Sequence, residues 1–226
     1  MIAMVLAAGR GERLRPITDT VPKALVDVGG VSLLERHLGM LQGAGVSTVV
    51  INLGWLGEKI VERIGSGRAY GLHVVYSPEY DNVLETGGGN LRALPQLGSD
   101  LFWVVNADVF SDYRIDQDSI PDDCLAHLVL VPTPAHKSKG DFDLVAGKVR
   151  NAEYPLLTFS GIGCYRAEFF AGPETGRFSL APLLHRAADA GRLSGSRFDG
   201  KWHDVGTPER LDELNRELAH HGASAS

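Results

Sequence analysis

Short apolar runs recur through the first half of the chain, at residues 3–6, 48–52, 73–77 and 102–105. Each run has the length of a strand that is buried on both faces of a sheet. Between the first three runs, leucine, isoleucine and valine recur every three to four positions, which is typical of helices that pack along one face. Because strands and helices alternate, we expect an α/β fold with a mixed, mostly parallel sheet that is flanked by helices.

Local signals place the ends of several helices. Ser32 is a candidate N-cap, and Glu35 completes a capping box at the start of a helix that Gly43 ends. His37 falls on the apolar stripe of this helix, so we interpret it as a packed side chain rather than a catalytic one. Further helices are predicted at residues 56–64, 90–94, 180–187 and 208–218.

The pattern changes in the second half of the chain. Strands are predicted at residues 126–131 and 158–163, and residues 144–149 are typical of a hairpin. We therefore expect mixed or antiparallel pairing in this half of the sheet. No repeat and no long linker divides the sequence, so we expect one domain over residues 1–226, with a frayed tail at 220–226.

The segment after the first apolar run carries the clearest candidate chemistry. Ala7, Ala8, Gly9 and Gly11 have small side chains or none, so the backbone can turn sharply and approach a ligand closely. Backbone N–H groups in such a turn form a concave anion site. Three cationic side chains follow closely, namely Arg13, Arg15 and Lys23. The combination favours a polyphosphate ligand, and a solvated turn with scattered charges is the alternative interpretation.

Two common glycine-loop motifs do not fit this segment. The dinucleotide fingerprint needs a third glycine where this chain has Leu14, and the next strand-like run ends in Asn52 rather than in an acid. The Walker motif needs Gly-Lys-Ser/Thr at its end, and that tripeptide is missing after Gly11. A nicotinamide-dependent dehydrogenase is therefore a distant alternative.

Two further segments are expected at the same edge of the sheet, because ligands of parallel sheets bind beyond the carboxyl ends of the strands. After the third run, Gly87, Gly88 and Gly89 favour a close backbone approach to a flat ligand such as a base, or else a flexible turn before the helix at 90–94. After the fourth run, Asp108 either caps the following turn or binds Mg²⁺ together with water molecules.

The glycine segment also resembles the signature of a known family. The matching pattern is Leu6-x-Ala8-Gly9-x-Gly11-x-Arg13-Leu14-x-Pro16, followed by Pro22-Lys23. It is similar to the signature of the sugar-1-phosphate nucleotidyltransferases. The resemblance implies a Rossmann-like nucleotidyltransferase domain, in which residues 1–112 mainly bind the nucleotide and residues 113–226 mainly bind the sugar phosphate.

The same resemblance implies roles for individual residues. Arg13, Lys23 and Asp108 are the expected catalytic residues, and Mg²⁺ is expected on Asp108 and Asp204. The expected nucleotide-binding residues are Leu6, Ala7, Ala8, Gly9, Gly11, Glu79, Thr86, Gly87 and Asn106. The expected sugar-phosphate-binding residues are Asp141, Gly161 and Trp202. For the glycine among them, a bulge in a strand is an equally good interpretation.

One family feature is missing from this chain. Many members carry Glu-Lys-Pro before a strand of the sugar-binding half, with the lysine near the sugar phosphate, whereas this chain has Glu153-Tyr154-Pro155. The cation that binds the sugar phosphate is therefore unassigned. The candidates are Lys137, Lys139, Arg150 and Lys201.

Composition narrows the possible partners and location. The 226 residues are 44% hydrophobic and 22% charged, which is ordinary for a globular protein. The net charge of −6 argues against nucleic acid or an anionic membrane as the main partner, and no obligate protein partner is evident. The first apolar run is too short to span a membrane, and Cys124 and Cys164 lack metal-ligand spacing. We therefore expect a cytoplasmic protein with free thiols.

Taken with the resemblance, these features predict an Mg²⁺-dependent transfer of a nucleotidyl group, expected to be UMP from UTP, to a sugar 1-phosphate. The segment at residues 85–88 resembles uridylyl- and thymidylyl-type members of the family. The compact length and residues 140–142 resemble the branch that acts on N-acetylmuramate 1-phosphate in cell-wall peptidoglycan recycling. Glucose-type or mannose-type acceptors stay open, as does a nucleotide-sugar sensor of the same fold that lacks catalysis.

Overall fold

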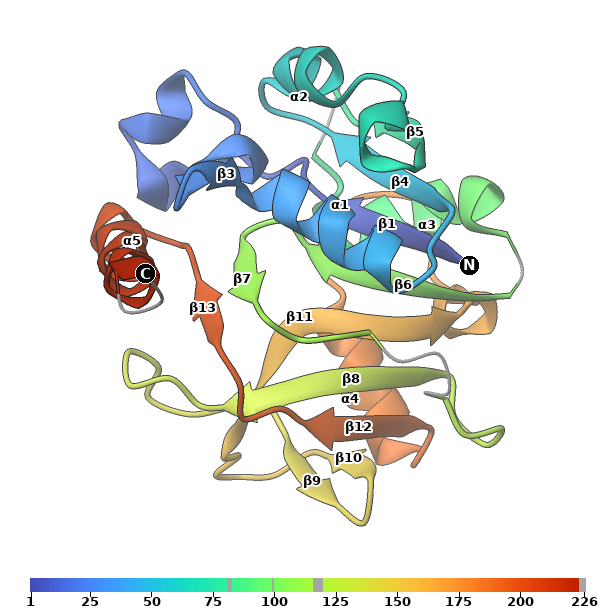
Figure 1. Cartoon of the computed structure of the whole chain (residues 1–226). Helices are drawn as coiled ribbons and strands as arrows, with labels where there is room; N and C mark the ends of the chain where they lie inside the picture. Colours follow the sequence, from blue (N-terminus) through green and yellow to red (C-terminus); the bar gives the residue numbers. More distant parts are fainter. Residues whose placement is uncertain (81–82, 99, 116–119, 224–226) are drawn as a thin grey trace.

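One large sheet runs through the molecule (Figure 1). The computed structural model describes residues 1–80, 83–98, 100–115 and 120–223. The strands of this sheet are β1 (Ile2–Leu6), β4 (Thr48–Leu53), β5 (His73–Pro78), β6 (Leu101–Asn106), β8 (Ala126–Pro132), β9 (Asp143–Val145), β10 (Lys148–Arg150), β11 (Leu157–Arg166) and β12 (Leu193–Arg197). Within the described residues they lie in the order β5-β4-β1-β6-β11-β8-β12-β10-β9.

The pairing of the strands divides the sheet into a parallel part and a mixed part. Strands β5, β4, β1 and β6 are all parallel to one another. Strand β11 then pairs antiparallel with β6 and with β8, and β12 runs parallel to β8. The predicted α/β fold with a mixed sheet around a parallel core is therefore confirmed.

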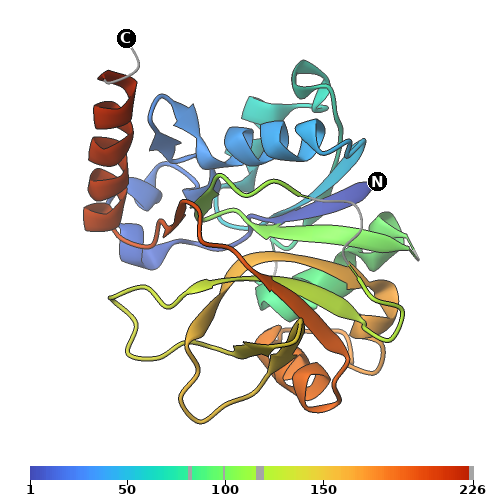
Figure 2. The same cartoon turned by 60° about the horizontal axis from the view of Figure 1, so that its bottom comes forward.

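Helices cover both faces of the sheet. The helices α1 (Leu33–Gly43) and α2 (Gly57–Ile64) pack on one face, and α3 (Glu85–Leu97) and α4 (Ala181–Asp189) pack on the other. Figure 2 shows α1 and α4 on opposite sides of the strands. Because side chains alternate along a strand, Val5 of β1 faces α1, whereas its neighbour Met4 faces the opposite core.

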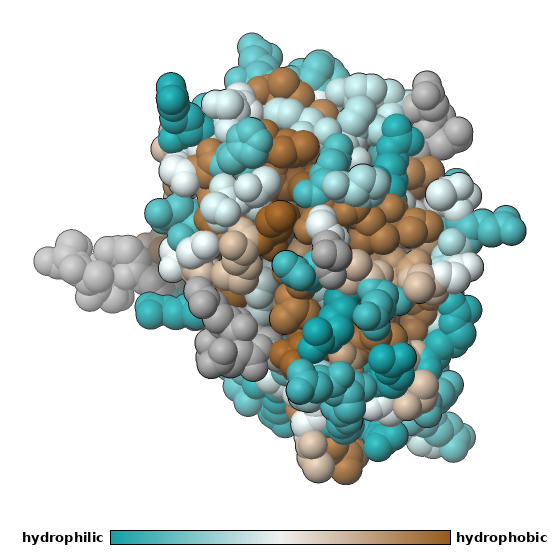
Figure 3. Space-filling model, turned by 90° about the vertical axis from the view of Figure 1, so that its right-hand side faces the viewer, coloured by the Kyte–Doolittle hydropathy of each residue, from teal (hydrophilic) through white to brown (hydrophobic). Residues whose placement is uncertain are grey.

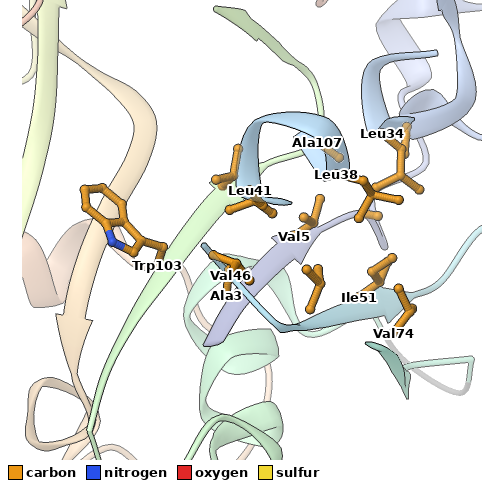
Figure 4. Packing of buried hydrophobic residues seen from close by; sticks show 14 of the residues in the cluster. Ala3, Val5, Leu34, Leu38, Leu41, Val46, Ile51, Val74, Trp103 and Ala107 are labelled. Atoms are coloured by element: carbon orange, nitrogen blue, oxygen red, sulfur yellow. The ribbon is translucent and has the colours of Figure 1, made fainter. Parts of the chain in front are cut away.

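The core under α1 illustrates this packing. Leu38 of α1 lies over Val5 of β1 and Ile51 of β4 (Figure 4), and all three side chains are 0% exposed. Burial of a leucine or isoleucine side chain stabilises the folded state by about 2 kcal/mol. The apolar stripe that predicts this helix therefore also explains where it packs.

A smaller third core lies beneath α5 (Pro208–Ala223). Leu211 and Leu214 of this helix pack with Leu14, which follows the glycine segment, and with Val205. Two short sheets lie near this core: β2 (Asp27–Val28) pairs with β3 (Val31–Ser32), and β7 (Val109–Ser111) pairs with β13 (Trp202–Asp204). The last helix thus ties the glycine segment to the end of the chain.

Two local predictions are wrong. Helix α3 begins at Glu85 and includes residues 87–89, which the sequence places in a turn before a helix at 90–94. These glycines are accommodated in the helix because other parts of the chain pack directly against them, as described below. Residues 220–223 continue α5 and do not form an irregular tail, while the rest of the predicted tail, residues 224–226, lies outside the described residues.

The surface at the amino ends of the parallel strands is chemically mixed. Figure 3 shows this side of the molecule, on which hydrophilic and hydrophobic residues are interspersed. Among the residues that the structure describes, no helix is both long enough and apolar enough to cross a membrane.

Candidate active site

A cavity of about 170 Å³ opens at the carboxyl ends of β1 and β6. The strand order reverses between these two strands, which is where open α/β sheets bind their ligands. Several residues selected from the sequence line it: Leu6, Ala7, Ala8, Gly9, Lys23, Glu79, Thr86, Asn106 and Asp108. The structure therefore brings together most of the expected nucleotide-binding and catalytic residues, from five separate segments of the chain.

Hydrogen bonds with Asn52, Trp55 and Thr18 hold the glycine segment at the rim of this cavity. The N–H of Ala7 donates to Asn52 Oδ1 at 2.6 Å, and the carbonyl of Ala8 accepts from the N–H of Trp55 at 3.3 Å. Gly11 adopts φ = 68°, and its carbonyl accepts from the Thr18 hydroxyl at 2.8 Å. Within the described residues, the backbone N–H groups of residues 8–11 donate no hydrogen bond to the protein. They are available to an anion.

A buried polar network supports the segment and was missed in the sequence. Asn52 Nδ2 donates to Glu79 Oε1 at 2.9 Å, and Glu79 Oε2 accepts from the N–H of Leu84 at 2.9 Å. Asn52 is 3% exposed and Glu79 is 2% exposed. Because buried polar groups need partners, these bonds fix the ends of β4 and β5 relative to the loop. In the sequence, the only signal of this network is Asn52, a polar residue at the end of an apolar run.

The glycines of α3 make room for protein atoms. The N–H groups of Gly87 and Gly88 both donate to the carbonyl of Phe178, at 3.0 and 3.1 Å. A Cβ at Gly87 would lie 2.3 Å from the Phe178 ring, and one at Gly88 would lie 2.1 Å from the Gly176 carbonyl oxygen. Gly87 is therefore not placed against the cavity, and its N–H is not available to a nucleotide. Thr86, one residue earlier, lines the cavity and accepts from the N–H of Leu180.

The two aspartates expected to bind Mg²⁺ are brought together by the short sheet of β7 and β13. Asp204 is paired with Val109, and the N–H of Val205 donates to the carbonyl of Asp108 at 2.9 Å. Each carboxylate has a cationic partner: Lys23 Nζ lies 2.6 Å from Asp108 Oδ2, and Arg210 Nη1 lies 2.9 Å from Asp204 Oδ2.

These two acids fit a magnesium ion that is shared with substrate. Mg²⁺ in phosphate-transfer sites keeps several waters and uses one or two carboxylates together with phosphate oxygens. Among the described residues, no group of three or more His, Cys, Asp or Glu side chains is placed to hold a metal. Two partly exposed acids fit such an ion, because the other ligands would come from phosphate oxygens and water.

His37 lies beneath the turn that carries Asp108. It is 4% exposed, and burial lowers its pKa to about 4, although the nearby charge of Asp108 opposes this shift. The imidazole is therefore neutral at pH 7. Its place in the core agrees with the interpretation of a packed side chain.

Of the residues expected on the sugar side, Gly161 belongs to β11, and Asp141 and Trp202 contact the backbone of that strand. Gly161 has φ = 81°, within an irregularity of the strand register between Phe159 and Gly163. A Cβ at Gly161 would lie 2.8 Å from Asn106 Nδ2, so the glycine gives room to a side chain of the cavity. The bulge that the sequence left open as an alternative is therefore present. Trp202 Nε1 donates to the carbonyl of Ser160 in the same bulge, at 2.9 Å.

Other selected residues lie outside the cavity lining. Asp141 Oδ2 accepts from the N–H of Phe159 at 2.9 Å and pairs with Lys137 Nζ at 3.4 Å. Arg15 pairs with Asp19 at 2.6 Å. The remaining residues outside the lining are Gly11, Arg13, Gly87, Gly161, Trp202 and Asp204.

Two of the cations proposed to replace the missing lysine are also directed elsewhere. Lys201 pairs with Glu217 at 3.4 Å. Arg150 is exposed and belongs to β10, which lies near one edge of the large sheet. Neither residue lines the cavity, so the structure gives no support to these two candidates.

A glycine loop with available N–H groups, followed by a lysine and an aspartate in one cavity of an α/β sheet, is the constellation of a nucleotidyltransferase. Residues 3–112 match the MobA-like NTP transferase domain family. Over 222 residues, the chain is 47% identical to the N-acetylmuramate alpha-1-phosphate uridylyltransferase of Neisseria meningitidis serogroup B, covering 94% of this chain and 96% of the relative. The chain belongs to the sugar-1-phosphate nucleotidyltransferase family.

A second relative agrees with this assignment, and a solved structure shares the fold. The N-acetylmuramate alpha-1-phosphate uridylyltransferase of Caulobacter vibrioides is 36% identical over 235 residues, covering 96% of this chain and 97% of the relative. A crystal structure assigned to a glucose-1-phosphate thymidylyltransferase of Bacillus anthracis superposes with a TM-score of 0.83 at 20% identity, covering 96% and 95% of the two chains. At that identity the superposition supports the fold alone.

Proposed function

We propose that this protein transfers UMP from UTP to N-acetylmuramate 1-phosphate, which gives the UDP-sugar and pyrophosphate. The observation that carries the proposal is the convergence of the glycine segment, Lys23 and Asp108 on one cavity. The sugar and the base come from the relatives named above, whose similarity extends over nearly the whole chain. Such a reaction belongs in the cytoplasm, where nucleoside triphosphates are held, and serves the reuse of cell-wall peptidoglycan.

The chemistry follows from the charges of the reactants. An oxygen of the acceptor phosphate attacks the α-phosphorus of the nucleotide, a new P–O bond forms, and the bond to the pyrophosphate breaks. The nucleophile is already an anion, so it requires no general base. The protein therefore contributes positioning and charge neutralisation.

Individual residues share this work. The N–H groups of residues 8–11 bind the triphosphate, and Lys23 and Arg13 stabilise the charge that develops on the α-phosphate and the pyrophosphate. Asn106, Thr86 and Glu79 position the nucleoside in the cavity.

Asp108 and Asp204 would hold Mg²⁺, since they are adjacent across β7 and β13 and need only substrate oxygens and water to complete a shell. When bound, the ion would act as a Lewis acid toward the phosphate oxygens. As the substrates enter, Lys23 exchanges its contact with Asp108 for one with phosphate.

The test is pyrophosphate release in the presence of Mg²⁺, measured for four nucleoside triphosphates, each with a panel of sugar 1-phosphates. We expect release with UTP and N-acetylmuramate 1-phosphate. Release with another pair would keep the reaction type and refute the assigned substrates. Binding of nucleotide sugar without release from any pair would favour a sensor and refute catalysis.

Asp108→Asn tests the assigned chemistry in the same assay. We expect turnover to fall by at least about 10³-fold, because the variant loses a carboxylate at the transferring phosphates. The thermal unfolding transition should stay cooperative, since Asp108 is partly exposed. Asp212→Asn removes an exposed carboxylate from α5 and serves as the matched control. A variant Asp108→Asn that retains full turnover would contradict the assignment.

A further inference from the structure

Two guanidinium groups converge on a single point beside Gly206. The position that a Cβ would occupy there lies 3.0 Å from Arg210 Nη1, 3.3 Å from Arg13 Nη2 and 2.9 Å from Asp204 Oδ1. Arg210 comes from the first turn of α5, whereas Arg13 comes from the segment after the glycine loop. Because residue 206 has no side chain, the space between the three groups stays open.

The charges around this point do not balance. Arg210 is paired with Asp204 at 2.9 Å, and both side chains are partly exposed, at 24% and 22%. Among the described residues, Arg13 has no ion pair within 4.0 Å. One carboxylate therefore faces two guanidinium groups. Cations that converge without enough acids favour a second anion between them.

We propose that Arg210 binds the phosphate group of the acceptor sugar phosphate, at a point that Arg13 also reaches from the side of the triphosphate. This inference rests on the proposed function and assigns the cation that the missing Glu-Lys-Pro lysine leaves open. The guanidinium of Arg210 offers the fork geometry that suits a phosphate. It lies beside the expected metal ligand Asp204, whereas the triphosphate is assigned to the glycine segment, Lys23 and Arg13.

The assignment accounts for the contact between Arg210 and Asp204. When the acceptor phosphate enters, the guanidinium releases the carboxylate and binds the phosphate. Asp204 would then be available to hold a metal ion. A residue that only neutralised Asp204 would compete with Mg²⁺ and would not change the affinity for the acceptor.

The first test compares steady-state kinetics of the full chain with Arg210→Ala, Arg210→Lys and the control Arg216→Ala. Arg216 lies on the same helix, is exposed, and donates to the carbonyl of Asp212. We expect Arg210→Ala to raise the KM for the acceptor by about 10- to 100-fold, because charge-assisted bonds to phosphate are lost, with a KM for UTP that changes less than about threefold. Arg210→Lys should recover part of the effect.

An unchanged KM for the acceptor in Arg210→Ala, while the wild type is active, would overturn the inference. If this variant also binds Mg²⁺ more tightly, Arg210 is a partner of Asp204 and nothing more. Circular dichroism and the retained charge of Arg210→Lys separate these outcomes from a failure to fold.

The second test is independent of turnover. Titration of the protein with inorganic phosphate, followed by ³¹P NMR, should show weaker binding in Arg210→Ala and in Gly206→Val, which places methyl groups at the point of convergence. Equal binding in the wild type and both variants would refute the anion site. Weaker binding in the variants of a protein that releases no pyrophosphate from any pair would support the site while refuting the proposed function.

Discussion

Glu35 provides a stability test with a defined pH window. Its carboxylate accepts from the Ser32 hydroxyl at 2.6 Å and the Tyr70 hydroxyl at 2.8 Å, and Arg63 Nη2 lies 3.1 Å from it. Burial raises its pKa, but the bonds from Ser32, Tyr70 and Arg63 outweigh burial and lower the pKa from 4.5 to about 2. The carboxylate thus joins the start of α1 to α2 and to residues 68–70.

The free-energy contribution follows from this shift. At about 1.36 kcal/mol per pKa unit, the difference between 4.5 and about 2 corresponds to about 3 kcal/mol. The side chain is 13% exposed, and solvent screening reduces the expected value to about 2 kcal/mol. Because the pKa is lower in the folded state, the unfolded chain binds more protons between these values. The stabilisation is complete above pH 4.5 and is lost as the pH falls toward 2.

The assay is urea unfolding of the wild type and of Glu35→Gln, followed by circular dichroism at a series of pH values. At pH 7 the variant should be less stable by about 2 kcal/mol, and the gap should shrink steadily below pH 4.5. Glu58→Gln removes an exposed acid of α2 and should change stability by less than about 0.5 kcal/mol. A gap that is absent at pH 7, or that does not change with pH, would refute the reasoning.

Two further predictions concern buried contacts near the cavity. Asn52→Ala leaves the N–H of Ala7 and Glu79 Oε1 without their partner, so stability should fall by about 2 kcal/mol and the KM for UTP should rise. Unchanged unfolding and kinetics would contradict the role of the network. Gly88→Ala should destabilise by about 1–3 kcal/mol despite the better helix propensity of alanine, because its Cβ would collide with the Gly176 carbonyl. Gly39→Ala in α1 meets no atom within 4 Å and should stabilise by up to about 1 kcal/mol, so equal effects of the two glycine variants in thermal melts would exclude the packing explanation.

The features that could be predicted from the sequence depend on local patterns. The buried run of β1, the capping box of Ser32 and Glu35, and the apolar stripe of α1 are each encoded within a few neighbouring residues. The rule that ligands bind at the carboxyl ends of parallel strands then places Lys23, Asp108 and the glycine segment in one cavity.

The features that could not be predicted depend on partners distant in sequence. Asn52 bonds to Ala7 from 45 positions away, and nothing in the local sequence identifies that partner. The glycines of α3 were misinterpreted because their neighbours come from other segments: Phe178 and Gly176 lie against Gly87 and Gly88, and the Glu79 carboxylate lies against Gly89. Likewise β7 and β13 have three residues each, too few for a periodic signal, although they bring Asp108 and Asp204 together.

The order of strands has a consequence for how the nascent chain acquires activity. During synthesis, β6 emerges well before β11, its partner on one edge, and an unpaired strand edge is a template for contact with other chains. The glycine face of α3 is likewise uncovered until Phe178 has been made. The second aspartate reaches β7 only when β13 emerges, after every strand of the large sheet has been made. Both halves of the sheet therefore leave the ribosome before Asp108 and Asp204 can come together.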